Sequence, residues 1–134
     1  MNKTNFKLSL LGLLFVFLVI SCDKEENPKA IVRVMETIDS VSVPAEHVLV
    51  EVGPPTQEEV LEDVVAEGYT NSDGYIKFEF DKELVLRAVA TRYELDAQGN
   101  PILDDDGNPI RESTGYKTIV LKKDYTDSRV IELR

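Results

Sequence analysis

From Ala30 onward the chain carries its apolar residues in short runs, rich in valine and isoleucine, that turn residues separate. No long stretch has the 3.6-residue period of an amphipathic helix, whereas several have the period of two that places alternate side chains in a core. β-Branched residues also favour extended strands. The pattern predicts an all-β domain of about seven strands, which is the strand content of a β-sandwich.

The expected strands cover residues 31–37, 47–52, 84–92, 115–121 and 129–133, with one more on each side of a turn at residues 71–74. Alternation predicts these core residues: Val32, Val34, Met35, Val48, Val50, Val52, Ile76, Phe78, Phe80, Ile119, Leu121, Ile131 and Leu133. Thr56 and Glu59 have the spacing of a helix capping box, so a short helix from residue 57 to about 63 is the expectation there, followed by β-branched residues that favour a strand.

The clearest local signal is the turn itself, with the sequence Asn71-Ser72-Asp73-Gly74. Asn and Asp side chains bond to nearby backbone amides, and Gly takes a positive φ without steric cost. Residues 75–80 then alternate strictly between apolar and polar. We expect two antiparallel strands to meet at this turn.

The first residues have the pattern of a secretory signal. Lys3 and Lys7 give a positive start, and residues 8–20 are apolar except for Ser9 and Gly12. This stretch of 13 residues is shorter than the roughly 20 that a helix needs to span a bilayer. The sequence therefore predicts a signal peptide over residues 1–21.

Val19-Ile20-Ser21-Cys22 resembles the lipobox of bacterial lipoproteins. The resemblance implies cleavage between Ser21 and Cys22, a lipid thioether on the Cys22 sulfur and acylation of the new amino terminus. A thiol suits this transfer because its thiolate is a strong nucleophile. Two or three acyl chains anchor a protein stably in a membrane, which one chain does not. The alternatives are an ordinary cleaved signal, or a membrane helix, with an incidental cysteine.

A charged segment follows the cysteine, and residues 22–29 are expected to form a flexible charged tether. Lys24, Glu25 and Glu26 resemble the surface-export signals of Bacteroidota lipoproteins, in which a lysine followed by acidic residues is typical. The resemblance implies an outer-membrane, lipid-anchored protein on the cell surface. The alternatives are a solvated linker and a periplasmic orientation.

Charge excludes one class of partner. Removal of residues 1–21, which hold Lys3 and Lys7 but no acid, changes the formal net charge from −10 to about −12. Binding to a phosphate backbone needs clustered Lys and Arg, so we predict no nucleic-acid partner. The chain has no tryptophan and its tyrosines and phenylalanines are scattered, so the sequence indicates no aromatic platform.

Residues 70–78, Thr-Asn-Ser-Asp-Gly-Tyr-Ile-Lys-Phe, and the following Leu-Val-Leu-Arg-Ala at 84–88 resemble carboxypeptidase-regulatory-like and related prealbumin-like (transthyretin-like) domains. In that group a T-x-x-D-G turn enters an alternating strand, and the final strand ends on an inward leucine, here Leu133. The resemblance implies a single antiparallel Greek-key β-sandwich over residues 30–134. Such sandwiches serve as spacers, adhesion modules, pilin units and carriers, so the resemblance does not specify a function.

The transthyretin-like group also includes a hydrolase of hydroxyisourate, which uses more than one histidine and a characteristic C-terminal tetrapeptide. Here His47 is the only histidine and the chain ends Ile-Glu-Leu-Arg. No G-x-S-x-G motif is present, and the sole cysteine is the lipidation candidate. We therefore predict a protein that is not an enzyme, without catalytic residues and with no cofactor beyond the lipid on Cys22.

A short internal repeat lies within the long segment 95–113. Asp96-Ala-Gln-Gly-Asn-Pro-Ile102 recurs eight residues later as Asp104-Asp-Asp-Gly-Asn-Pro-Ile110, which predicts a protruding hairpin or ordered loop. Asp104, Asp106 and Asn108 are the residues that a calcium ion would take. However, Ile102 stands where an acid is needed, and no glutamate follows at the required spacing. The expectation is a solvated acidic loop and no metal.

Three functions remain open. The first is a non-catalytic binding or adhesion module that presents the 95–113 loop to a protein or glycan partner, because loops on a rigid scaffold carry most recognition. The second is a fimbria-like structural subunit that assembles by strand addition. The third is a small-ligand carrier or hydrolase.

Overall fold

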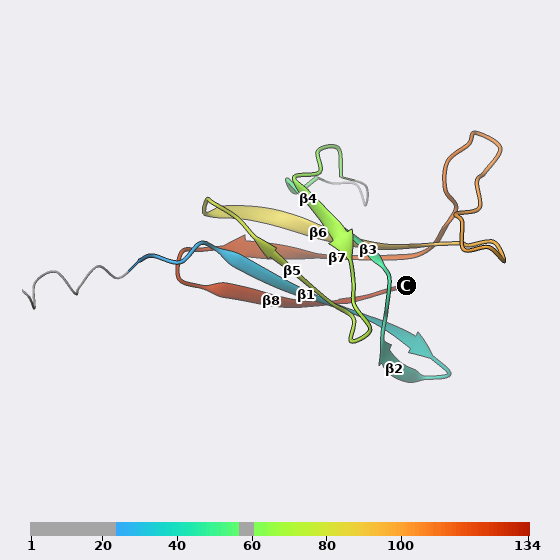
Figure 1. Ribbon diagram of the computed structural model, residues 1–134, viewed down its shortest axis with the longest axis horizontal. Coiled ribbons are helices and arrows are strands. Elements are labelled where there is room, and N and C mark those ends of the chain that lie inside the picture. Colours follow the sequence, from blue (N-terminus) through green and yellow to red (C-terminus); the bar gives the residue numbers. More distant parts are fainter. Residues whose placement is uncertain (1–23, 57–60) are drawn as a thin grey trace, which may run out of the picture.

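The computed structural model describes residues 24–56 and 61–134. These residues form eight strands and no helix, in two four-stranded sheets that lie face to face (Figure 1). The strands are β1 (Lys29–Ile38), β2 (Val41–Pro44), β3 (Leu49–Gly53), β4 (Ala66–Tyr69), β5 (Tyr75–Glu79), β6 (Leu84–Tyr93), β7 (Arg111–Leu121) and β8 (Thr126–Glu132). The predicted all-β sandwich is confirmed.

The first sheet is built around β1. Strands β5 and β2 follow one another along one edge of β1, and β8 lies along the other edge. The second sheet has the order β4-β3-β6-β7. All pairings are antiparallel except that of β1 with β8, which is parallel although the sequence suggested only antiparallel neighbours. The chain returns to β1 for this last strand by crossing over from the other sheet.

Small and β-branched side chains fill the core between the sheets. The residues at alternate positions of β1 and β3, Val32 and Val34 with Val50 and Val52, are fully buried, as their period of two predicts. Phe78, Leu86, Ile119, Leu121 and Ile131 complete the packing with several alanines. Of the other predicted core residues, Val48 is buried, and Met35, Ile76, Phe80 and Leu133 are half-buried.

One prediction about the turn at residues 71–74 is wrong. The strands before and after it do not pair as a hairpin, because β4 pairs with β3 and β5 pairs with β1. The turn carries the chain from one sheet to the other. A strand's alternation specifies its buried face but not its partner, so the sequence signal is the same for both arrangements.

The predicted helix near Thr56 lies partly outside the described residues. Residues 57–60 are not described, and residues 61–65 contain bends but no helix. Val65 donates its amide to the carbonyl of Val52, so the chain returns to β3 before β4 begins. The strand predicted after this segment starts at Ala66.

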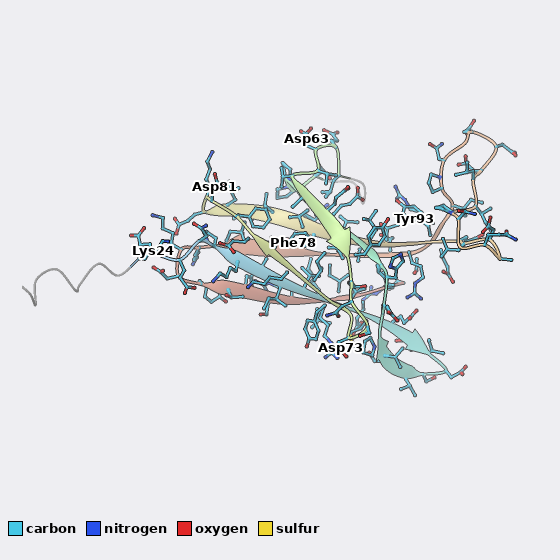
Figure 2. All side chains as sticks on the ribbon, in the orientation of Figure 1. Lys24, Asp63, Asp73, Phe78, Asp81 and Tyr93 are labelled. Carbon is cyan, nitrogen blue, oxygen red and sulfur yellow. The ribbon has the colours of Figure 1, made fainter. Side chains whose placement is uncertain are left out.

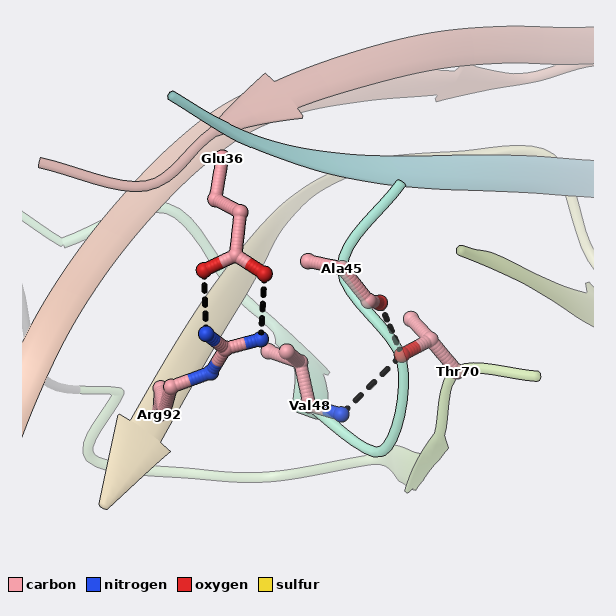
Figure 3. Close-up of polar contacts among 5 residues, drawn as sticks. All are labelled: Glu36, Ala45, Val48, Thr70 and Arg92. Carbon is pink, nitrogen blue, oxygen red and sulfur yellow. Dashed lines mark hydrogen bonds and ion pairs between the residues drawn. The ribbon is translucent and has the colours of Figure 1, made fainter. Parts of the chain in front are cut away.

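Thr70 ties the inter-sheet turn to the loop between β2 and β3 (Figure 3). Its side chain is buried, and its hydroxyl donates to the carbonyl of Ala45 at 2.7 Å and accepts from the amide of Val48 at 3.0 Å. Gly74 closes the same turn with φ of 76°, and an added Cβ would lie 2.5 Å from the carbonyl oxygen of Val34. In the T-x-x-x-G pattern, the threonine is therefore needed for its hydrogen bonds, and the glycine is needed because it has a positive φ and no room for a Cβ.

The sandwich is open along the seam between β7 and β8. No ladder joins these two strands within the described residues, although they come together at both ends of the seam. Thr114 and Arg134 exchange backbone hydrogen bonds at one end, and the buried Asp127 accepts from the amide of Val120 at 2.7 Å at the other. Between them lies a groove of about 790 Å³.

The end of the expected tether is held against the domain. Glu26 and Asp124 exchange hydrogen bonds, Glu25 forms an ion pair with Lys123 at 2.5 Å, and Pro28 is buried. Strand β1 already begins at Lys29. Residues 25–29, which the sequence assigned to the flexible tether, therefore contact the folded domain.

Candidate functional site

The internal repeat forms two hairpins that project from the ends of β6 and β7 (Figure 1). In the first, one carboxylate oxygen of Asp96 accepts from the amides of Gln98 and Asn100, both at 2.9 Å. In the second, Asp104 accepts in the same way from Asp106 and Asn108. Each hairpin also has the fourth-position glycine at φ of 84°. The predicted protruding structure is thus two copies of one turn.

The same turn occurs a third time between the sheets. Asn71 accepts from the amides of Asp73 and Tyr75 through its side-chain oxygen, and the amide of Gly74 donates to the carbonyl of Asn71. The shared pattern is Asn or Asp followed by Gly three residues later. The spacing can be read from the sequence, but the two residues between the Asn or Asp and the Gly differ among the three turns, so the third copy does not stand out.

A ring of backbone hydrogen bonds joins the two hairpins to the sheet. The amide of Ile102 donates to Glu94, that of Ile110 donates to Ile102, and that of Glu94 donates to Ile110, all at 2.8 to 2.9 Å. The eight-residue period of the repeat places these three residues together. The repeat is therefore an ordered extension of the domain.

A hollow of about 380 Å³ lies beside the first hairpin, on the outer face of the β4-β3-β6-β7 sheet. Leu49 and its cross-strand partner Thr91 line it, on the face of the sheet opposite to the core residues Val50 and Ala90. Leu49 is half-buried and Thr91 is buried. Tyr93, Leu95 and Pro101 line it on the side of the repeat. Figure 2 shows Tyr93 at the base of the projecting hairpins.

His47 and Tyr69 line the hollow on the side of β3 and β4. Their rings are stacked, with centroids 4.7 Å apart and an interplanar angle of 13°. His47 has φ of 57°, and its amide donates to the carbonyl of Thr70, so the loop that Thr70 fixes also fixes this ring. Loops thus bring these two rings together although they are distant in sequence.

An ion pair at the end of the core positions Arg92, which also lines the hollow. Arg92 on β6 binds both carboxylate oxygens of Glu36 on β1, so the pair joins the two sheets (Figure 3). Both side chains are largely buried. Such a two-point contact fixes the guanidinium in orientation as well as in position. No local pattern indicated this pair, because the two residues are distant in the chain and charged residues are abundant.

The charges around the hollow are mostly acidic. Glu46 and Glu112 line it, are exposed and form no ion pair with any described residue. On the neighbouring part of the sheet, partial burial and the facing carboxylate of Glu67 raise the pKa of Glu51. The hydrogen bond from the Asn100 amide lowers the pKa of Asp96.

The calcium candidates are engaged within their own turn. Asp104 holds two backbone amides, and Asp106 and Asn108 supply those amides. Over residues 24–56 and 61–134, the acids and the histidine form no group of three that could hold a metal ion. His47, the only histidine of the chain, stacks on Tyr69.

Of the predicted anchoring residues, Val19, Ile20, Ser21 and Cys22 lie outside the described part of the chain. The export-signal candidates Lys24, Glu25 and Glu26 lie within it. Glu26 binds Lys29 at 2.8 Å, which lowers the pKa of Glu26 and raises that of Lys29. The described residues contain no helix with the length and apolar character that a bilayer span requires.

No family model and no curated protein matches this sequence. Among solved structures, the chain is similar to GBS52, the minor pilin of the Gram-positive pathogen Streptococcus agalactiae, with a TM-score of 0.48 and 12% sequence identity. The match covers 81% of this chain and 44% of the pilin chain, so this chain spans less than half of that length. A likeness at this level adds no argument about function.

Proposed function

We propose that this chain is a surface lipoprotein, anchored through Cys22, whose sandwich domain is a non-catalytic binding module. The hollow and the two repeat hairpins form its binding end. We infer further that the anchor is in the outer membrane and that Lys24, Glu25 and Glu26 belong to the export signal. The partner is a protein or a glycan outside the cell.

The observation that carries this proposal is the placement of the two ends of the domain. Lys24, next to the proposed anchor, lies at one end of the long axis, and Tyr93 and the repeat hairpins lie at the other (Figure 2). Glu25 and Glu26 contact the β7–β8 turn, so the residues next to the proposed anchor are held at this end of the domain. A lipid at Cys22 would therefore leave the hollow directed away from the membrane.

The first test is the intact mass of detergent-extracted protein from cells, beside that of a Cys22→Ala variant. We expect the wild-type chain to begin at Cys22 and to carry acyl chains, and the variant to lack them. Protease treatment of whole cells should remove the wild-type domain if it faces outward. An unacylated wild-type mass would contradict the anchor, and full protection from protease would contradict the surface location.

Size-exclusion chromatography of the same protein separates binding from assembly. A monomer at all concentrations agrees with a binding module. Growth of oligomers with concentration would favour a subunit that assembles through the open edge of β7.

A further inference from the structure

We propose that the hollow binds the guanidinium group of an arginine side chain in a basic peptide or protein. The hollow is defined by His47, Leu49, Tyr69, Tyr93 and the two rim carboxylates Glu46 and Glu112. This inference rests on the proposed function, because it names the partner of the same binding end. The charge, the aromatic surface and the size of the hollow each favour this ligand.

Charge favours a cation. The lining contains one arginine, Arg92, and no lysine, and the Arg92 guanidinium is already bound at two points by Glu36. Glu46 and Glu112 therefore remain uncompensated among the described residues. The adjoining segment adds to this field, since residues 94–111 hold five further acids and only Arg111 as a base. A positively charged group is the complement of this surface.

The aromatic rings favour a guanidinium over an ammonium. Tyr69 is stacked on His47 and is still 56% exposed. A planar guanidinium can lie over such a ring and also bind a carboxylate at two points, whereas an ammonium is a compact, strongly hydrated charge. Two arginines of this domain already lie over tyrosine rings: Arg33 lies 4.9 Å from the Tyr75 ring centroid and Arg87 lies 4.7 Å from that of Tyr116.

The volume of the hollow also agrees with the binding of one arginine side chain. Small-ligand sites usually enclose about 300–1,000 Å³. The hollow, at about 380 Å³, is at the lower end of this range and suits a single arginine side chain. Further basic residues of the partner would then face the acidic repeat hairpins. A neutral glycan would use the aromatic rings but would gain nothing from the two carboxylates.

The test is isothermal titration calorimetry of the full-length protein in detergent with two capped peptides. One is tetra-arginine, and the other is tetra-citrulline, which has nearly the same shape but no charge. We expect tetra-arginine to bind at least tenfold more tightly and its affinity to fall as salt rises. Equal affinities, or no binding of tetra-arginine, would overturn the proposal.

A matched pair of variants separates the hollow from the overall acidity of the domain. Glu46→Gln with Glu112→Gln removes the rim charges, and Asp63→Asn with Asp81→Asn removes two exposed charges away from the hollow (Figure 2). We expect at least a tenfold loss of affinity in the first variant and less than a twofold loss in the second. Equal losses in both would overturn the proposal.

Tyr69→Leu checks the aromatic contribution, with an expected loss of three- to tenfold. A thermal melt of each variant ensures that the fold is retained, and unchanged tetra-arginine affinity in a folded Tyr69→Leu variant would overturn the stacking argument. If the protein does not bind arginine, the proposed function can still hold, and the two results can be told apart. A lipidated, protease-accessible protein that binds a neutral glycan and not tetra-arginine would remain a surface binding module.

Discussion

At the scale of single residues, Thr70 connects the position of the hollow's lining to the stability of the domain. Its hydroxyl satisfies the amide of Val48 and the carbonyl of Ala45 inside the domain, and its own carbonyl accepts from His47. Buried polar backbone groups that lose their partners destabilise a fold more than an average hydrogen bond stabilises it. The position of His47 and the stability of the domain are therefore coupled through Thr70.

We predict that Thr70→Val lowers the free energy of unfolding by about 2–4 kcal/mol, because it leaves two buried backbone groups without partners. Urea denaturation of the purified protein measures this change. Thr70→Ser is the control, since it keeps the hydroxyl and should cost no more than about 1 kcal/mol. Equal losses in the two variants would mean that the methyl group, and not the hydroxyl, is the important part.

At the scale of elements, the alternating strands were predictable and their partners were not. Val32, Val34, Val50 and Val52 show their buried face by their period of two. The turn at Asn71 indicates a reversal of the chain, and the same turn closes a hairpin at Asp96 but crosses between sheets at Asn71. Whether such a turn joins neighbours or sheets depends on the rest of the core, which no local pattern contains.

The candidate site was predictable only in part, because local sequence patterns do not show which distant residues come together. The repeat is a local feature, so its protrusion and order could be inferred from Asp96 and Asp104 and their glycines. The hollow depends on rings from different strands, and the wall formed by Arg92 depends on Glu36 from the other sheet. Such a site appears in sequence only as scattered residues.

Asp96 gives the first hairpin a dependence on pH. The amide of Asn100 lowers the pKa of Asp96 below its ordinary value of 3.8. A group with a lowered pKa in the folded state stabilises that state above its unfolded pKa, and this contribution is lost as the pH falls through the folded value. We predict that residues 96–100 open as the pH falls below about 4 while the core remains folded.

Amide signals of Gln98 and Asn100 in NMR spectra, followed from pH 6 to pH 2.5, measure this opening. Asp96→Asn is the control, because an amide oxygen can accept the same hydrogen bonds and does not titrate. Its signals should show no transition in this range. A transition of the same size in the variant would assign the effect to other carboxylates.

At the scale of the whole molecule, stability depends on how the two sheets close at their seam. Gly115 lets β7 approach the backbone of β8, since an added Cβ would collide with the carbonyl of Glu132. At the other end the closure depends on Asp127, a carboxylate that is only 2% exposed. It binds the amide of Val120 at 2.7 Å and the guanidinium of Arg129 at 3.0 Å. The two sheets are thus joined at the ends of the seam by contacts other than a strand ladder.

We predict that Asp127→Ala lowers the free energy of unfolding by about 2–3 kcal/mol, since the Val120 amide loses a charged acceptor. Asp127→Asn keeps an acceptor oxygen and should lose about half as much. The loss should also reach the N-terminal end of the domain, because the β7–β8 turn binds Glu25 and Glu26. Hydrogen exchange should therefore rise at residues 24–28 and 120–128 in Asp127→Ala, and not in the repeat hairpins. A variant as stable as wild type would show that the core alone holds the two sheets together, with no contribution from the seam.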